Sequence, residues 1–336
     1  MKPDYHLLAE AYSAPKAAPY RRELDPAACR EFGLTWPILS DPCKARRTFE
    51  PYRKRLEANG VSLANGRVLD VGCGTGVFSV YFVFCGAREC VGVDFPAARL
   101  TVCRAFANML PYGLSERLRP LACRIEDLAG EGPFDLIFCN EVISQLSGLD
   151  ALARFHGLLA DGGRLFISDG HNACNPWLRY RTQNLYRFRE EGPSGRPGGR
   201  VIEKSYRQRR AELIAERFRG RLTNREAQML AERTAGLYGE ALYAACERYV
   251  REGGPPESYY IPDTAPVDPK TGIRHGPLLD PWELCERLKA AGFRRCEVYA
   301  CLPGTHRLAP VAWLDRIVPT SLKLRVASGF MIAALR

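Results

Sequence analysis

Short apolar runs alternate with longer amphipathic runs along the chain from residue 67 to residue 169. The pattern predicts buried strands at 67–71, 90–94, 119–123, 134–139 and 164–168. It predicts helices at 77–84, 97–109 and 149–159 between them. Strands this apolar, separated by helices, are typical of a parallel sheet that is covered on both faces. We therefore expect an α/β fold.

The pattern changes between residues 170 and 279. Arg-rich helical sequence dominates there, and Thr223 and Glu226 stand at capping-box spacing before another helical run. A helix at 280–293 and strands at 294–301 and 329–336 then restore the α/β character. Because the sheet resumes afterwards, we interpret 170–279 as an insertion into one domain, and connections this long usually carry function.

The expected organisation follows from these patterns. Residues 1–60 form an N-terminal helical cap, and residues 61–169 together with 280–336 form the core. Residues 170–279 form a mainly helical lid or substrate domain.

The composition of the 336 residues is that of an ordinary globular protein, with 46% hydrophobic and 26% charged residues, which excludes a disordered or fibrous chain. The longest apolar stretch, residues 76–86, is too short to cross a bilayer, and the N-terminus lacks the apolar run of an export signal. The 13 cysteines include no CxxC motif, so we interpret them as reduced thiols. We expect a cytoplasmic protein without a membrane span.

The net charge of +10 is concentrated in one segment. Residues 171–240 hold 15 Lys and Arg against 8 Glu. Such an excess attracts anions, nucleic acid included. Acidic residues are interleaved through the same helices, however, so a solvated amphipathic surface explains the pattern equally well. We expect a small-molecule partner, anionic or glycosylated, rather than nucleic acid.

A glycine turn, Gly72 to Gly76 (GCGTG), joins the first expected strand to the first helix. Glycines let the backbone approach a ligand closely, and a helix N-terminus offers free N–H groups. Asp94 ends the second strand, where a carboxylate can accept both hydroxyls of a ribose. No Lys follows Gly76 as a P-loop requires, and Ser79 replaces the third glycine of a dinucleotide site. A tight turn without a ligand is the alternative.

Five motifs in consistent order resemble the class I S-adenosylmethionine-dependent methyltransferases, nearest in pattern to the quinone and small-molecule O-methyltransferases. The motifs are VLDVGCGTG, VGVDF, GPFDLIFCNEVISQL, LLADGGRLFISD and LCERLKAAGF. The match covers residues 44–169 and 280–336. The resemblance implies a Rossmann-like, doubly wound sheet of seven strands with strand seven antiparallel and a large mainly helical insertion after strand five. It also implies S-adenosylmethionine as the cofactor and S-adenosylhomocysteine as its product.

The resemblance assigns cofactor-binding roles residue by residue. Gly72, Gly74 and Gly76 would contact the methionine part, with Asp70 supporting the loop. Asp94 would hold the ribose. The remaining cofactor-binding candidates are Arg53 for the carboxylate, Cys73 in the turn, Phe95, Ile125 and Glu126 at the adenine, and Asn140 and Glu141 beside the sulfonium.

Methyl transfer from a sulfonium is an in-line displacement in which the protein positions the acceptor and, for a hydroxyl, removes a proton. Asp169 and His171 follow the fifth strand, where ligands bind in such sheets, and are the catalytic candidates. Gln145 stands where relatives carry a histidine, so that histidine cannot be invoked. The acids that a divalent metal would need from other loops are not evident, so we expect no metal site.

The acceptor is expected to be a hydroxyl of a small biosynthetic intermediate, by analogy with the O-methylating relatives. Tyr259, Tyr260 and His275 in the insertion are the candidate substrate residues. An S- or N-methyltransferase and a catalytically inert cofactor-binding scaffold remain as alternatives. The sequence leaves the oligomeric state open, with a homodimer as one option.

Overall fold

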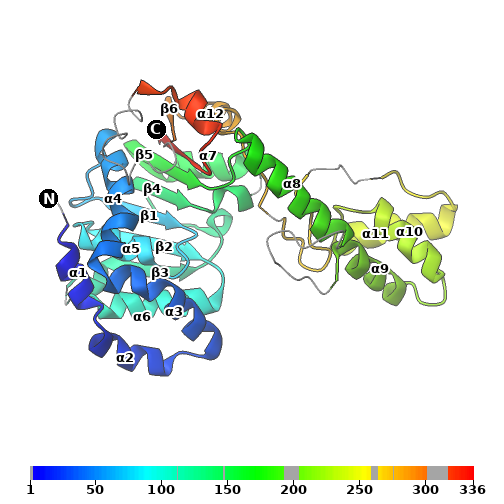
Figure 1. Ribbon diagram of the computed structural model, residues 1–336, viewed down its shortest axis with the longest axis horizontal. Helices are drawn as coiled ribbons and strands as arrows, with labels where there is room; N and C mark the ends of the chain where they lie inside the picture. Colours follow the sequence, from blue (N-terminus) through cyan, green and yellow to red (C-terminus); the bar gives the residue numbers. More distant parts are fainter. Residues whose placement is uncertain are drawn as a thin grey trace. The chain divides into compact units, whose positions relative to one another are not determined.

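A computed structural model of the chain describes residues 3–111, 113–146, 148–192, 204–258, 264–274, 276–300 and 317–336. The chain divides into two compact units. Figure 1 shows the ribbon with colours that follow the sequence. The first unit holds residues 1–170, 281–300 and 330–336, and the second holds residues 171–280 and 301–329.

The first unit is built on one seven-stranded sheet in the order β3-β2-β1-β4-β5-β7-β6. Strands β1 to β5 are parallel, and β7 runs antiparallel to β5 and β6. The expected doubly wound sheet with an antiparallel seventh strand is therefore confirmed. The strands are β1 (Arg67–Val71), β2 (Glu89–Asp94), β3 (Leu118–Ala122), β4 (Phe134–Asn140), β5 (Leu159–Asp169), β6 (Arg295–Tyr299) and β7 (Phe330–Leu335).

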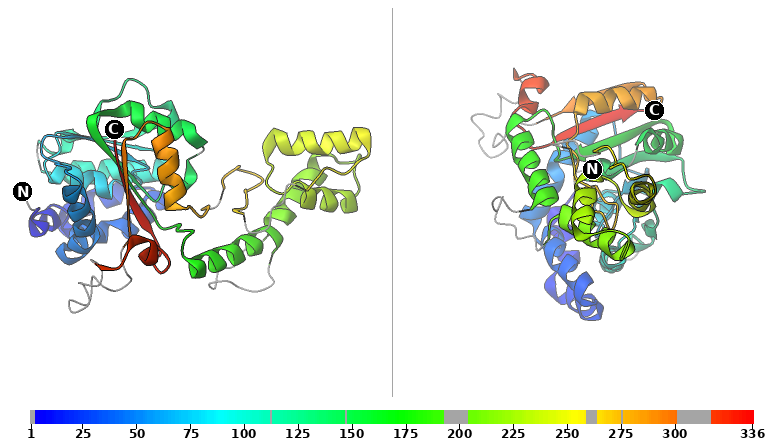
Figure 2. Two further views of the ribbon diagram at one scale, coloured as in Figure 1. Left: turned by 90° about the horizontal axis from the view of Figure 1, so that it is seen from above. Right: turned by 90° about the vertical axis from the view of Figure 1, so that its right-hand side faces the viewer.

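Helices cover both faces of this sheet, as Figures 1 and 2 show. Helices α5 (Val77–Phe84) and α6 (Ala97–Met109) connect strands that step toward β3, whereas α7 (Gly148–Leu158) connects strands that step the other way. Right-handed crossovers therefore place α5 and α6 on one face and α7 on the other. Helix α12 (Pro281–Ala290) contacts α7. Short helical turns η1 (Ser115–Arg117), η2 (Ile125–Asp127) and η3 (Ile143–Gln145) lie in the loops.

Four helices at the N-terminus extend the face that carries α5 and α6. They are α1 (Tyr5–Ala11), α2 (Ala14–Glu23), α3 (Pro26–Ser40) and α4 (Pro42–Ala58). Asp25 and Asp41 cap α3 and α4 through their carboxylates, each followed by a proline at the first helical position. Phe49 of α4 stacks on Tyr81 of α5 with ring centroids 4.3 Å apart. The helices expected in residues 1–60 thus share a core with the sheet.

The second unit contains α8 (Pro176–Glu191), α9 (Tyr206–Arg217), α10 (Asn224–Arg233), α11 (Gly239–Glu252) and α14 (Thr320–Leu324). The capping box expected at Thr223 and Glu226 is formed at the start of α10. A short stem closes the base of the segment: Leu279 N–H donates to the carbonyl of His171 at 2.7 Å, and Ala173 N–H donates to the carbonyl of Leu279 at 2.8 Å. These backbone hydrogen bonds join the two ends of the segment that runs from residue 171 to residue 280.

Several element boundaries differ from the expectation, and β5 and β6 are two examples. Strand β5 begins at Leu159 rather than at residue 164. Leu159 pairs with Phe134 before an irregularity in the pairing, and Asp161, Gly162 and Gly163 interrupt the apolar run there. Strand β6 spans Arg295–Tyr299, shorter than the expected 294–301, and residue 301 lies outside the described part. Among the described residues, no helix has both the length and the apolar content needed to cross a membrane.

A buried ion pair lies inside the second unit. The guanidinium of Arg210 on α9 donates to the carboxylate of Glu190 on α8, and its Nε donates to the carbonyl of Ala231 at 2.7 Å. Arg210 is 0% exposed and Glu190 is 2% exposed. Removing one partner leaves the other charge buried without compensation.

We therefore predict that Glu190→Ala lowers the free energy of unfolding by about 3–5 kcal/mol. The matched control is Glu247→Ala, which breaks the Arg221–Glu247 pair, whose side chains are 51% and 50% exposed. That exposed pair contributes about 0–1 kcal/mol. Urea denaturation followed by circular dichroism measures both variants. Equal losses in the two variants would contradict the prediction.

Candidate functional site

The glycine turn between β1 and α5 is held by packing at its first and last glycines. Gly72 has φ 67° and Gly76 has φ 78°, a backbone region that side chains rarely adopt. A Cβ atom on Gly72 would lie 2.1 Å from Val142 Cγ2, and one on Gly76 would lie 2.4 Å from Cys103 Sγ. Both positions therefore require glycine for the turn to form.

The middle glycine of the turn faces open space. Gly74 has φ 56°, and a Cβ atom there would meet no other described residue within 4 Å. Its N–H donates to Oδ2 of Asp94 at 2.7 Å, while Oδ1 of Asp94 accepts from Phe95 N–H at 2.7 Å. Asp94 is 9% exposed, and a carboxylate keeps further lone pairs after accepting two N–H bonds. The turn thus has a bare backbone beside an acceptor group.

Asp70 supports the turn from inside the sheet. It is 2% exposed, and Ser79 on α5 donates its hydroxyl to Asp70 Oδ2 at 2.6 Å. The pKa of Asp70 is raised to about 7: burial is the main cause, the Ser79 hydrogen bonds oppose it, and the neighbouring charge of Asp94 adds to it. This bond links the end of β1 to the first turn of α5.

Polar side chains also gather where β4 and β5 end. Asn140 and Ser168 are register partners, and Tyr52 of α4 donates its hydroxyl to Asn140 Oδ1 at 3.0 Å. The hydroxyls of Tyr52 and Ser168 lie 3.3 Å apart. Glu141 has φ 58°, its N–H donates to the Ser168 carbonyl at 2.8 Å, and its carboxylate lies against Gly170. Asp169, 1% exposed, is the last residue of β5.

The residues expected at the adenine lie at the ends of β2 and β3. Phe95 is 63% exposed, with the guanidinium carbon of Arg124 5.5 Å from its ring centroid. Ile125 is buried and Glu126 is exposed, both in the turn η2. The fold therefore brings Gly72–Gly76, Asp94, Phe95, Ile125 and Glu126 to the carboxyl ends of parallel strands, where sheets of this kind bind ligands.

Arg53 forms ion pairs with two glutamates of its own helix, α4. Its guanidinium donates to Glu50 Oε1 at 2.6 Å and also to Glu57, and the residue is 9% exposed. These hydrogen bonds raise the pKa of Arg53, and Arg53 lowers the pKa of Glu50. Two carboxylates thus already neutralise the side chain expected to bind the cofactor carboxylate, and that role stays a prediction.

The other expected residues divide between the units. His171 opens the second unit, and its Nε2 would lie 2.5 Å from a Cβ atom on Gly276. Tyr259, Tyr260 and His275 lie outside the described residues. The absence of a metal also stays a prediction.

Cysteines pack tightly around the turn. Cys73 Sγ would lie 3.0 Å from a Cβ atom on Gly92. Burial raises the pKa of Cys139 above its ordinary value. The described cysteines are free thiols, as the sequence indicated.

Sequence reasoning missed two residues that shape the site, Tyr52 and Ser79. Ser79 was considered only as a departure from a dinucleotide motif, yet its position one helical turn beyond the glycines lets it reach Asp70. Tyr52 belongs to no motif. Only its helical spacing could have indicated Tyr52, because it lies one turn after Phe49 on the apolar side of α4.

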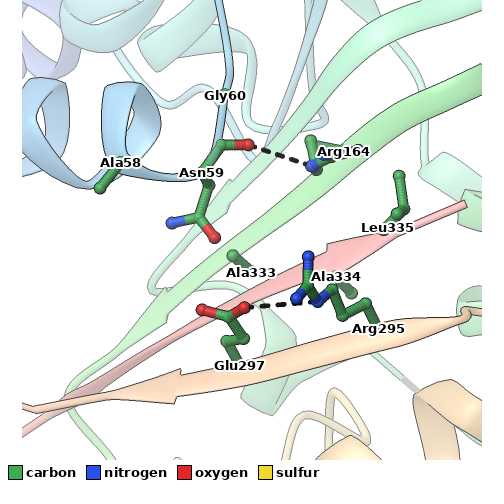
Figure 3. A pocket seen from close by; sticks show the side chains of 9 residues that line it. All are labelled: Ala58, Asn59, Gly60, Arg164, Arg295, Glu297, Ala333, Ala334 and Leu335. Carbon is green, nitrogen blue, oxygen red and sulfur yellow. Dashed lines mark hydrogen bonds and ion pairs between the residues drawn. The ribbon is translucent and has the colours of Figure 1, made fainter.

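Two cavities in the first unit lie at the opposite edge of the sheet. Figure 3 shows one of about 250 Å³, with Arg164 of β5 on one side and Arg295 and Glu297 of β6 on another. The second, of about 290 Å³, shares Arg164 and lies beside Gly66 and Asp135. Gly66, Asp135 and Arg295 lie at the amino ends of β1, β4 and β6, so neither cavity is the glycine-turn site.

The raised pKa of Asp70 predicts a pH dependence of stability. The unfolded chain releases this proton at a pKa of 3.8, whereas the folded protein keeps it to about 7. The free energy of unfolding therefore falls as pH rises from 3.8 to about 7 and stays at the lower level above that.

The neutral variant Asp70→Asn should flatten this fall, which thermal unfolding between about pH 5 and about pH 8 measures. Asp127→Asn, in the exposed turn η2, is the control and should keep the wild-type slope. An unchanged slope in Asp70→Asn would count against the assignment.

Comparisons with known proteins agree with this geometry. A family model described as a methyltransferase domain matches residues 44–213. The chain is 32% identical over 152 residues to a ubiquinone biosynthesis O-methyltransferase of Xanthomonas euvesicatoria pv. vesicatoria (strain 85-10), covering 44% of this chain and 61% of the relative. It is 36% identical over 156 residues to the protein of the same name from Xylella fastidiosa (strain M23), covering 44% and 59%.

The chain thus spans about 60% of the length of these relatives. A solved S-adenosylmethionine dependent methyltransferase from Mesorhizobium loti is similar over 84% of this chain and 96% of its own, with 14% identity and a TM-score of 0.43. The family model covers half of this chain and includes the glycine turn, Asp94 and the ends of β4 and β5. The chain belongs to the class I S-adenosylmethionine-dependent methyltransferase family.

Proposed function

We propose that this chain binds S-adenosylmethionine and transfers its methyl group to a hydroxyl of a small molecule. One observation carries the proposal: Gly74 presents bare backbone to open space, directly beside the carboxylate of Asp94. A left-handed glycine with no neighbour at its Cβ position fits a ligand that lies against the backbone. The nearby acceptor oxygens of Asp94 fit the two hydroxyls of a ribose.

The other strand-end residues complete the fit. Gly72 and Gly76 shape the turn, and the N-terminus of α5 provides free N–H groups for an amino-acid part of a ligand. Phe95, Ile125 and Glu126 are available to an adenine ring at the next strand ends. When bound, the cofactor supplies a methyl group that its cationic sulfur already activates for displacement.

The chemistry left to the chain is positioning and proton removal. Asp169 and His171 are proposed to take the hydroxyl proton, since Asp169 ends β5 at the carboxyl edge of the sheet and His171 is two residues further along the chain. The choice of a hydroxyl is supported by the O-methyltransferase names of the curated relatives. The excess of Arg and Lys at residues 171–240 supports an anionic acceptor.

Acceptors that differ in one atom test the reaction. Phenol, aniline and thiophenol are each incubated with the protein and S-adenosylmethionine that carries a labelled methyl group. Label on phenol supports O-methylation, whereas label on aniline or thiophenol alone overturns the choice of hydroxyl. Cofactor binding without transfer to any small molecule, a metabolite extract included, favours the inert scaffold that Gln145 suggested.

The ribose role of Asp94 gives a further prediction. Asp94→Asn removes the negative charge that accepts the hydrogen bonds, and it should weaken S-adenosylhomocysteine binding by about tenfold or more, as expected for hydrogen bonds to a charged group. Isothermal titration calorimetry measures the dissociation constant. Asp127→Asn should bind like wild type. If Asp94→Asn also binds like wild type, the proposed cofactor site is wrong.

A further inference from the structure

Tyr52 contacts two successive pairs of residues on one face of the sheet, an aromatic pair through its ring and a polar pair through its hydroxyl. Phe138 and Phe166 are register partners whose rings stack 5.9 Å apart, and the ring of Tyr52 packs edge-on against both, with centroid distances of 5.7 and 6.5 Å. The next partners on that face are polar, Asn140 and Ser168, and the Tyr52 hydroxyl reaches both. Phenylalanine would make the same ring contacts, so the hydroxyl serves only the polar pair.

The direction of these hydrogen bonds can be derived. Burial raises the pKa of Tyr52 and the charge of Glu141 raises it further, although the Ser168 hydrogen bond lowers it. The hydroxyl is therefore protonated and has a single hydrogen to donate. That hydrogen goes to Asn140 Oδ1, so the Ser168 hydroxyl donates to the Tyr52 oxygen.

This direction fixes what Asn140 offers a ligand. With Oδ1 occupied by Tyr52, the NH2 group takes the other arm of the planar amide and points away from Tyr52. An NH2 group only donates, so it fits a carboxylate oxygen and not an ammonium group. Cys139 pairs with Val71, which places Asn140 beside the first residue of the glycine turn, Gly72.

The proposed cofactor needs a hydrogen-bond donor for its carboxylate. The proposed cofactor carries a carboxylate on its amino-acid part, and Arg53, the expected partner, is neutralised by Glu50 and Glu57. We propose that Tyr52 is a positioning residue that orients the Asn140 amide so that its NH2 group donates to the carboxylate of bound S-adenosylmethionine. This inference rests on the proposed function and names the contact that holds the amino-acid part.

Two ligands separate this role from a structural one. S-adenosylhomocysteine carries the amino-acid part, whereas 5′-methylthioadenosine keeps the adenosine and the sulfur without it. Tyr52→Phe and Asn140→Ala should each weaken S-adenosylhomocysteine binding by about tenfold, in the range for a hydrogen bond to a charged group. Binding of 5′-methylthioadenosine should stay within about twofold of wild type, since that ligand makes no such bond.

A double variant tests whether the two residues act as one unit. Tyr52→Phe combined with Asn140→Ala should bind S-adenosylhomocysteine no more weakly than Asn140→Ala alone, because Tyr52 acts only through Asn140. The control is Tyr20→Phe on α2, which loses a hydroxyl that donates to the Asn108 carbonyl at 3.1 Å. It should bind both ligands like wild type.

Three other results for the variants would overturn the inference. Equal weakening of both ligands would mean that Tyr52 only supports the fold, and unchanged binding of S-adenosylhomocysteine would mean that Asn140 makes no such contact. Losses that multiply in the double variant would show independent roles. Failure of the wild-type protein to bind either ligand would instead refute the proposed cofactor site, whereas a Tyr52 variant that still binds 5′-methylthioadenosine shows that site intact.

Discussion

The hydrogen bond from Gly74 N–H to the Asp94 carboxylate is the constraint on which the site depends. It joins the turn after β1 to the end of β2 across 20 residues of sequence. Val142 and Cys103 fill the space on either side of the turn, so Gly72 and Gly76 have no room for a side chain. The turn is therefore fixed from three directions, while its middle residue, Gly74, has open space at its Cβ position.

The sequence predicted the parts of the fold whose apolar pattern is strong. The five parallel strands, α5 and α6 could be placed from the buried runs around the glycine turn, and Asp94 from its position at a strand end. The start of β5 was missed because Asp161, Gly162 and Gly163 interrupt the apolar run after Leu159, where the pairing with β4 shifts register. Hydrophobic periodicity reports buried runs and does not show that a strand continues across such an irregularity.

The partners of Arg53 on its own helix were missed, although their spacing is visible in the sequence. Arg53 was assigned by analogy of position, but Glu50 and Glu57 lie three and four residues away on α4, the spacing at which helical side chains meet. Tyr52 was missed for a different reason. It belongs to no motif, and the fold brings its hydroxyl to Asn140 and Ser168, which are 88 and 116 positions away in the sequence. Long-range contacts of this kind arise from the packing of a helix on the sheet, which the local pattern of a single sequence does not show.

The stem at the base of the second unit has an evolutionary consequence. Leu279 joins His171 and Ala173 through backbone hydrogen bonds, which any residue other than proline would allow at the two donor positions, 173 and 279. Closing a longer loop costs only about 0.6 kcal/mol for each doubling of its length. Residues between the two sides of the stem can therefore be lengthened, shortened or exchanged between relatives with little penalty to the sheet.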